Sequence, residues 1–338
     1  MTIQPIPNFR SVNTHHCVTG SMHQIYLFNN HDISEEMLLG LGQGVSFIYW
    51  HQKGESPFLG GRGMPKPSME ELAAQRTGVT LQMHKTTSTK KAKRTLLEML
   101  EQQQPVMLQV DMGFLPYFDF GGEEYHFGGH AVVACGYDAA TDTVLIADRD
   151  GMYPVPMTDL EKARGSTFKP FPPKNMWCTL DFSEKRQPTP EEVQMAICET
   201  AVLMLTPPIR NFGVKGIRKA AKMMLKWPEL LTPEQLKWTL FNGHIFISAI
   251  GGSGGGAFRY MYSRFLRETA VLTSNSNFND CADEFQQIGD DWELIAERFR
   301  ELSETADPEK HLGEVAAPLN ELAHQEEIAW QHLQSITL

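Results

Sequence analysis

Three residues whose types suit nucleophilic catalysis occur along the chain in the order Cys17, His130 and Asp148. Cys17 follows the segment Thr14-His15-His16 at the expected start of a helix, where the positive end of the helix dipole favours a thiolate. The thiolate form of a cysteine is the nucleophile, whereas the neutral thiol is not. Cys17 is therefore our candidate nucleophile, with a buried structural cysteine as the alternative.

His130 and Asp148 lie on two segments that we expect to form a β-hairpin. Residues 130–137 and 143–148 are predicted strands, and a short polar link joins them. If residue 132 pairs with residue 148, His130 and Asp148 share one face as diagonal neighbours, whereas a slip of one residue separates them. A histidine oriented by a carboxylate is the general base that a cysteine nucleophile needs for acyl transfer. A purely structural histidine is the alternative for His130.

Helices and strands are mixed in the first half of the chain, as the hydrophobic pattern predicts. Besides the hairpin, the expected elements are a helix over residues 17–29, a short helix capped by Ser68 and Glu71 and ended by Gly78, a helix over residues 90–103 and a strand over residues 105–111. The first of these helices would carry Cys17 at its N-terminus.

The second half of the chain is predicted to be almost wholly helical. Thr189-Pro190 and Thr232-Pro233 have the residue types of helix starts, and Asp307-Pro308 opens the last helix. Further helices are expected over residues 214–226, 257–270 and 280–303. The sequence thus predicts two domains, residues 1–183 and residues 190–338, joined by a polar linker at residues 184–189.

The combined pattern resembles the papain-like cysteine fold of bacteriocin-processing peptidases and, more closely, the butirosin biosynthesis protein H family. The segments that carry the resemblance are His16-Cys17, the helix at residues 96–100 with the strand at residues 105–110, Gly129-His130-Ala131-Val132-Val133, Ala147-Asp148 and residues 251–266. They cover most of the chain. The resemblance implies an α+β, papain-like domain followed by a mostly helical domain.

The resemblance also implies a cysteine acyltransferase of specialised metabolism. The family's named member moves an acyl group from a carrier-protein thioester to an amine of an aminoglycoside. Carried over to this chain, Cys17 would hold the acyl group, His130 would transfer protons and Asp148 would orient His130. Two alternatives stay open: a papain-like peptidase or amidohydrolase that acts with the same three residues, and a degenerate papain-like domain that binds a peptide or small molecule without catalysis.

The expected oxyanion hole departs from that of the peptidases, which place a glutamine a few residues before the cysteine. Here residues 11–14 are Ser, Val, Asn and Thr. Asn13 or backbone N–H groups are therefore the candidate donors. Such donors are often worth about 10²–10³-fold in rate.

A glycine-rich segment at residues 251–256 precedes a predicted helix, and glycines there can cradle a phosphate. A phosphopantetheine or coenzyme A thioester as co-substrate would fit this role. The candidate ligand-binding residues are Gly254, Gly255, Arg259 and Tyr260. A tight turn packed closely on neighbouring backbone is the alternative, and we favour it slightly. We expect no tightly bound cofactor and no metal, because the histidines and cysteines lack finger-type spacing and no HExxH motif occurs.

The composition of the 338 residues, with 41% hydrophobic and 21% charged, is that of a folded globular protein. The net charge of −11 argues against a nucleic-acid partner. The segment at residues 214–226 is nevertheless basic and amphipathic, so it could dock an acidic acyl carrier protein, a solvated face being the alternative. We expect a small-molecule amine acceptor, no membrane span and a cytoplasmic location, since no signal-peptide pattern precedes Cys17 and the five cysteines are scattered.

Overall fold

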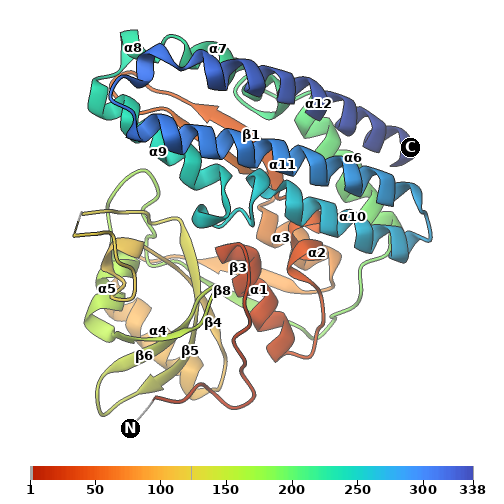
Figure 1. Ribbon diagram of the computed structural model, residues 1–338. Coiled ribbons are helices and arrows are strands. Elements are labelled where there is room, and N and C mark those ends of the chain that lie inside the picture. The colour runs from red at the N-terminus through yellow and green to blue at the C-terminus, as the bar shows by residue number, and fades with distance from the viewer. Residues whose placement is uncertain (1–2, 123, 338) are drawn as a thin grey trace. The chain divides into compact units, whose positions relative to one another are not determined.

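The computed structural model describes residues 3–122 and 124–337, and the chain forms two compact units (Figure 1). The first unit comprises Met1–Leu38 and Thr77–Gln187, and the second comprises Leu39–Arg76 and Pro188–Leu338. This division differs from the two predicted domains, because residues 39–76 pack with the later helices instead of with the sheet of the first half. The mixed helix and strand content of the first half and the helical second half agree with the prediction.

The first unit is built on a six-stranded sheet in which every neighbouring pair of strands is antiparallel. In sheet order the strands are β3 (Thr80–His84), β8 (Trp177–Asp181), β4 (Val106–Val110), β5 (His130–Asp138), β6 (Thr143–Ala147) and β7 (Met152–Pro156). The helices of this unit are α1 (Cys17–Phe28), α4 (Thr89–Glu101) and α5 (Met157–Gly165), with the short turn η1 (Met112–Phe114); α2 (Glu35–Leu41) begins in it.

The core of the first unit lies between the sheet and two helices. Alternate residues of the central strands face it, as the two-residue period of a strand requires; they are Val106, Leu108 and Val110 of β4 and Val132 and Ala134 of β5. Leu96 and Leu100 of α4 and Leu160 and Ala163 of α5 complete this core. Helix α1 packs against β4 and β5. The residue that begins α1 and the residue that begins β5 are the ones that the sequence marks for chemistry.

The second unit surrounds a two-stranded hairpin with helices. Its elements are β1 (Val45–Trp50), β2 (Phe58–Arg62), α3 (Met69–Arg76), α6 (Pro190–Leu205), α7 (Gly213–Met224), α8 (Trp227–Leu230), α9 (Pro233–Ile247), α10 (Arg259–Thr273), α11 (Asn277–Glu304) and α12 (Gly313–Thr337), with turns η2 (Ala249–Gly251), η3 (Gly256–Phe258) and η4 (Pro308–Lys310). The sequence patterns did not predict the hairpin, because five of the six residues of β1 are buried and no alternation marks it.

Local hydrogen-bonding signals in the sequence are confirmed at three helix starts. Ser68 and Glu71 bond each other's backbone N–H groups, as do Thr189 with Glu192 and Thr232 with Gln235. The predicted start of the last helix is wrong. Asp307-Pro308 opens only the turn η4, and α12 begins at Gly313. Within residues 3–122 and 124–337, no helix has the combined length and apolar character needed to cross a bilayer.

A buried ion pair lies at the centre of the second unit. The Arg259 guanidinium donates from Nε to the Glu326 carboxylate at 2.7 Å, and both side chains are fully buried. The same carboxylate accepts the indole N–H of Trp292 at 2.8 Å and that of Trp330 at 2.6 Å. Arg259 also donates to the backbone carbonyl of Ser46 at 2.8 Å, which ties the β1 strand to α10 and α12. This cluster connects segments that lie far apart in the sequence.

Replacing Glu326 should destabilise the second unit strongly. We expect Glu326→Gln to lower the free energy of unfolding by about 3–5 kcal/mol, because it leaves the buried Arg259 charge without its counter-ion. Urea unfolding followed by tryptophan fluorescence measures the loss. The matched control is Glu327→Gln, next in sequence, which breaks only the half-exposed pair with Arg218 and should cost less than about 1 kcal/mol. Equal costs for the two variants would contradict this assignment.

Candidate active site

Helix α1 begins at Cys17, so the predicted start of this helix is confirmed. The residue before it, His16, is the N-cap, and its Nδ1 accepts the backbone N–H of Thr19 at 3.4 Å. Cys17 is half-buried, and the residue that precedes it is buried. The thiol therefore lies in the first turn of a helix, where the unpaired N–H groups carry positive partial charge.

A buried carboxylate, Glu35, holds the segment that leads into Cys17. Its two oxygens accept the backbone N–H groups of His15 at 2.8 Å and His16 at 2.7 Å, and also the hydroxyl of Thr19 at 2.9 Å. One side chain thus fixes both the approach to α1 and its first turn. The sequence analysis did not identify Glu35 as a site residue, because it begins α2, eighteen residues after Cys17. Its only signal in the sequence is that of an acidic residue at a helix start.

The predicted hairpin between β5 and β6 is confirmed, and its register, which the sequence left open, is the one that puts His130 and Asp148 on one face. Val133 pairs with Ala147, which is the same register as residue 132 opposite residue 148. In this register the His130 imidazole donates from Nε2 to Oδ2 of Asp148 at 2.7 Å, and both side chains are buried. Because Nε2 is taken by Asp148, Nδ1 is the nitrogen left to interact with Cys17. The structure therefore brings Cys17, His130 and Asp148 together.

Two imidazoles act on the Cys17 thiol. Burial by itself raises the pKa of the thiol, but the charges of His16 and His130 and hydrogen bonds with both rings lower this pKa well below its ordinary value. The net shift is the opposite at two other cysteines. Burial raises the pKa of Cys135 to about 12, and burial together with the charges of Glu284 and Asp280 raises that of Cys281 to about 12. The environment thus favours a thiolate at Cys17 and a neutral thiol at Cys135 and Cys281.

His130 and Asp148 stabilise each other's charged forms. Burial alone lowers the pKa of His130, but the carboxylate of Asp148 and the Cys17 side chain raise it to about 9. Burial raises the pKa of Asp148, but the charge and hydrogen bond of His130 lead the interactions that lower this pKa overall. A thiolate, an imidazolium and a carboxylate are therefore the forms favoured near neutral pH.

Aromatic side chains cover the buried His130–Asp148 pair. The hydroxyl of Tyr117 donates to Oδ2 of Asp148 at 2.9 Å, and its ring stacks on that of Tyr153 with centroids 4.2 Å apart. Phe118 meets the His130 ring edge to face at a centroid distance of 5.6 Å. Tyr117 and Phe118 come from the loop before β5, which the sequence patterns did not assign to the site. Its only signal was the density of aromatic residues over residues 114–127, on both sides of Gly121-Gly122.

A second buried carboxylate, Asp111, anchors this aromatic loop at both ends. Its Oδ1 accepts the backbone N–H groups of Gly113 and Phe127, each at 3.1 Å. Its Oδ2 accepts from Nδ1 of His126 at 2.9 Å and from the hydroxyl of Ser166 at 2.6 Å. Since the loop runs directly into β5, these bonds also set the position of the strand that begins with the candidate base.

The remaining predicted site residues have different surroundings. Asn13 is exposed, and its role as an oxyanion donor stays a prediction. The side chain of Arg259 is fully buried against Glu326, and its ligand role stays a prediction. In the glycine-rich segment, the N–H of Gly255 donates to Ser253 and that of Gly256 to Glu293, while the hydroxyl of Tyr260 donates to Asp290.

The favoured alternative for this segment, a tight turn, agrees with its backbone. Gly254, Gly255 and Gly256 all have positive φ, and a Cβ on Gly256 would lie 2.7 Å from the backbone of Gly289. For Gly254 and Tyr260, a ligand role stays a prediction.

The first unit thus combines an antiparallel sheet with a Cys–His–Asp site in which the cysteine begins a helix. Two family models match this chain. Residues 16–149 match the family model described as "Butirosin biosynthesis protein H, N-terminal", and residues 158–333 match the one described as "Domain of unknown function (DUF4872)". The second match covers more than half of the chain, which therefore belongs to the DUF4872 family, and residues 16–149 are similar to the N-terminal part of butirosin biosynthesis protein H. No curated protein is similar enough to count as a match.

The lowered pKa of Cys17 should be visible in its alkylation. Because the thiolate persists until the pH falls through this lowered pKa, the pH profile of iodoacetamide modification of Cys17 should have its midpoint well below that of an ordinary thiol. In His130→Gln the lowering interactions with His130 are lost, so the midpoint of the pH profile should move upward. Mass spectrometry of the Cys17 peptide measures the rate. A profile with the midpoint of an ordinary thiol, unchanged in His130→Gln, would contradict the prediction.

Replacing Glu35 should also change the alkylation rate of Cys17, because Glu35 holds the segment that leads into this cysteine in position. Glu35→Gln removes one of the two oxygens that accept three hydrogen bonds, so we expect a loss of about 1–3 kcal/mol in the free energy of unfolding. Displacement of the first turn should also slow Cys17 alkylation at pH 6 by about tenfold. The matched control is Glu36→Gln at the next position. A variant that is destabilised but keeps the full alkylation rate would leave Glu35 with a structural role alone.

Proposed function

We propose that the protein is a cysteine-dependent acyltransferase that moves an acyl group from a thioester donor to an amine acceptor. The observation that carries the proposal is the Cys17–His130–Asp148 arrangement, in which the thiol has a lowered pKa and His130 donates to Asp148 at 2.7 Å. A thiolate beside an oriented imidazole is the arrangement that nucleophilic acyl transfer requires. The match of residues 16–149 to a family model described by butirosin biosynthesis supports a role for the enzyme in specialised metabolism.

In the first half-reaction, the Cys17 thiolate attacks the carbonyl carbon of the donor thioester. A new carbon–sulfur bond forms, and the donor's carbon–sulfur bond breaks as the tetrahedral intermediate collapses. The departing thiolate takes the proton from Nδ1 of the His130 imidazolium and leaves as a free thiol. The acyl group is then held on Cys17 as a thioester, and His130 is neutral. Asp148 keeps the ring in the orientation that presents Nδ1.

In the second half-reaction, the amine nitrogen of the acceptor attacks the carbonyl carbon of the Cys17 thioester. Neutral His130 accepts a proton from this nitrogen, the carbon–sulfur bond breaks and an amide forms. Cys17 returns as the thiolate beside an imidazolium, so the site is ready for another donor. Asn13 and the backbone N–H groups at the start of α1 are the proposed donors to the oxyanion in both steps.

The aromatic cover favours transfer to an amine over hydrolysis. Tyr117, Phe118 and Tyr153 shield the buried His130–Asp148 pair, which limits the access of water to the base. An acyl group on Cys17 would then persist until an acceptor amine binds. Amide or peptide hydrolysis at the same residues is the outcome expected if water does enter freely.

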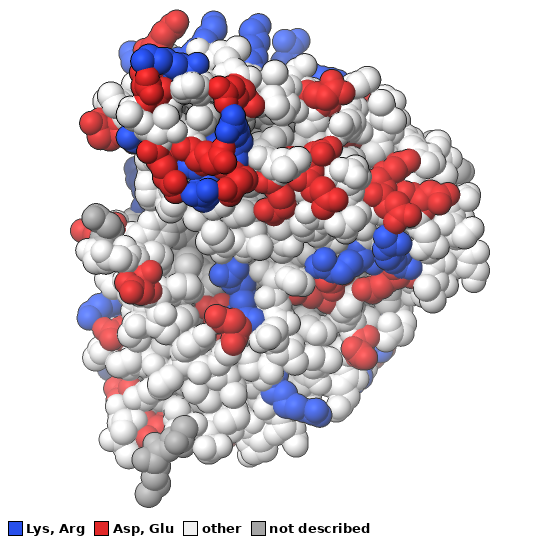
Figure 2. Space-filling model, in the orientation of Figure 1, with Lys and Arg blue, Asp and Glu red and all other residues white. Residues whose placement is uncertain are grey.

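An acyl carrier protein is the donor that we propose, with the acyl group on its phosphopantetheine. Carrier proteins of this kind are acidic, and helix α7 presents exposed Lys215 and Lys222, followed by Lys226. Figure 2 shows lysine and arginine side chains gathered along the edge of the second unit where α7 and α8 lie in Figure 1. Arg218 of the same helix is instead paired with Glu327. Complementary charge of this type increases the association rate and depends on salt.

Intact mass measurement after incubation with an acyl-pantetheine thioester tests the proposal. We expect one acyl adduct per chain, absent in Cys17→Ala, and formed about 10²–10⁴-fold more slowly in His130→Gln. Addition of small amines should then discharge the adduct as an amide. The rate should fall in acid as Cys17 is protonated, and fall again above about pH 9 as His130 loses the proton that the departing thiol needs.

Three outcomes separate the proposed function from its alternatives. Discharge of the adduct by water, with no amide formed, would identify a hydrolase. The absence of any adduct, together with ordinary alkylation of Cys17, would leave a binding protein. For the carrier, Lys215→Glu with Lys222→Glu should slow the reaction of a carrier-bound donor while leaving that of free acyl-pantetheine unchanged. An equal effect on both donors would exclude docking on α7.

A further inference from the structure

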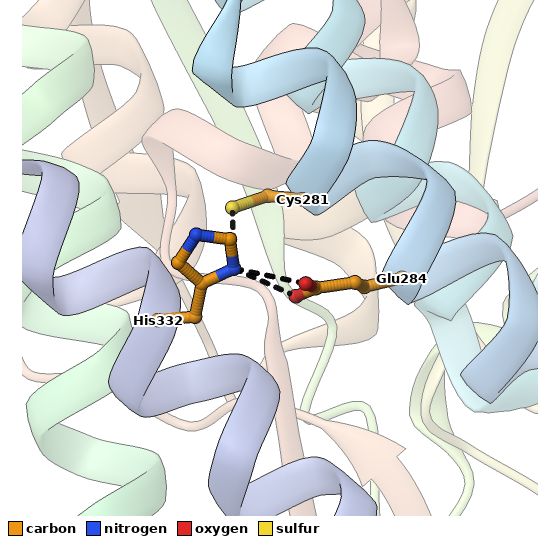
Figure 3. A group of neighbouring side chains, drawn as sticks. All are labelled: Cys281, Glu284 and His332. Carbon is orange, nitrogen blue, oxygen red and sulfur yellow. Dashed lines mark hydrogen bonds and ion pairs between the residues drawn. The ribbon is translucent and has the colours of Figure 1, made fainter.

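A second cluster of potential ligand atoms lies in the second unit, on helices α11 and α12. Cys281 and Glu284 are three residues apart on one face of α11, and His332 reaches them from α12. Figure 3 shows the three side chains converging. Sγ of Cys281 lies 3.8 Å from Nδ1 of His332, and this Nδ1 lies 2.9 Å and 3.1 Å from the two carboxylate oxygens of Glu284.

Nδ1 of His332 lies near both the Cys281 thiol and the Glu284 carboxylate, and it cannot accept from the first and donate to the second at the same time. Nδ1 of a neutral imidazole either carries a proton or offers a lone pair. With the proton it serves the Glu284 carboxylate, and without it the Cys281 thiol can donate but the carboxylate faces a lone pair. A cation at the point that the three atoms share gives the sulfur, the nitrogen and the oxygen a partner at the same time.

We propose that Cys281, Glu284 and His332 form a binding site for Zn²⁺. One thiolate, one imidazole and one carboxylate are all common zinc ligands, and a mixed sulfur, nitrogen and oxygen set disfavours Mg²⁺ and Ca²⁺. The ligand atoms lie within 4.8 Å of one another, whereas tetrahedral zinc with its usual bond lengths needs separations of about 3.4–3.6 Å. Binding must therefore lengthen the Glu284–His332 contact of 2.9 Å and shorten the Cys281–His332 distance of 3.8 Å, each by a few tenths of an ångström.

The surroundings suit a metal that fastens two helices together. Tyr262, Phe285 and Trp330 pack against one another beside the site, with ring centroids 4.6–5.1 Å apart, and they hold α10, α11 and α12 in place. Glu284 and His332 are each 39% exposed, so solvent can deliver the ion and a water can complete the tetrahedron. Binding releases the Cys281 proton, and any proton on Nδ1, to solvent.

The site escaped the sequence analysis because its third ligand comes from a distant helix. Cys281 and Glu284 alone have no recognised motif spacing, and His332 lies fifty-one residues beyond Cys281. The proposal does not depend on acyl transfer, since all three residues belong to the second unit and Cys17 to the first.

Metal titration of the reduced, metal-stripped full-length protein tests the proposal. The experiment uses a Cys17→Ser background. This change removes Cys17, a second thiol that lies beside histidines and could bind Zn²⁺ itself. We expect one equivalent of Zn²⁺ to bind in competition with a chromophoric chelator, and Co²⁺ to give a thiolate-to-metal charge-transfer band. Cys281→Ser and His332→Gln should each weaken Zn²⁺ binding by more than about 100-fold. Zn²⁺ should raise the thermal unfolding midpoint only where the three ligands are intact.

Cys198→Ser is the matched control, because Cys198 is a half-buried cysteine of the same unit outside the cluster. It should bind Zn²⁺ and Co²⁺ as the background protein does. Circular dichroism and the unfolding midpoint without metal show whether each variant is folded, and Glu284→Gln, at a half-exposed position, provides a ligand variant that should fold normally. The absence of a charge-transfer band, or a band and affinity unchanged by Cys281→Ser, would overturn the proposal.

Discussion

The register of β5 against β6 is the constraint on which the candidate site depends. His130 begins one strand, and Asp148 follows the end of the other. Because the side chains of a strand alternate between faces, a slip of one residue would send one of these two groups to the opposite face of the sheet. The observed pairing of Val133 with Ala147 keeps them within one hydrogen bond. Asp111, which anchors both ends of the loop before β5, helps to hold the strand in this position.

Opposing electrostatic effects define the site itself. Burial disfavours each charged form, since it raises the pKa of Cys17 and lowers that of His130. Mutual attraction reverses both effects, so that the charged forms become favourable only as a set. The geometry must then be kept closely, and this explains why a buried carboxylate, Glu35, takes three hydrogen bonds from the segment at the start of α1. The two units share this use of buried acids, because Glu326 similarly gathers Arg259, Trp292 and Trp330.

The glycine-rich segment shows how one pattern can serve two physical purposes. Glycines before a helix suit a phosphate, but they equally suit a chain that must pass close to another backbone. Here Gly256 lies against Gly289, and its N–H is bound by Glu293, a carboxylate of the protein itself. Arg259, which the same pattern offered as a ligand contact, is used inside the second unit. These contacts agree with the tight turn that the sequence analysis favoured slightly over a phosphate site.

The sequence by itself determined the features that depend on neighbouring residues: the helix that begins at Cys17, the three capped helix starts and the β5–β6 hairpin with its short link. These features depend on local hydrogen bonds and on the periodicity of hydrophobic residues, and both can be recognised within a short stretch of sequence. Only the tertiary structure decided that residues 39–76 join the later helices, that Glu35 and Tyr117 belong to the site, and that His332 reaches Cys281. Each of these depends on the packing of distant segments, and no local pattern records which distant surface a residue will meet.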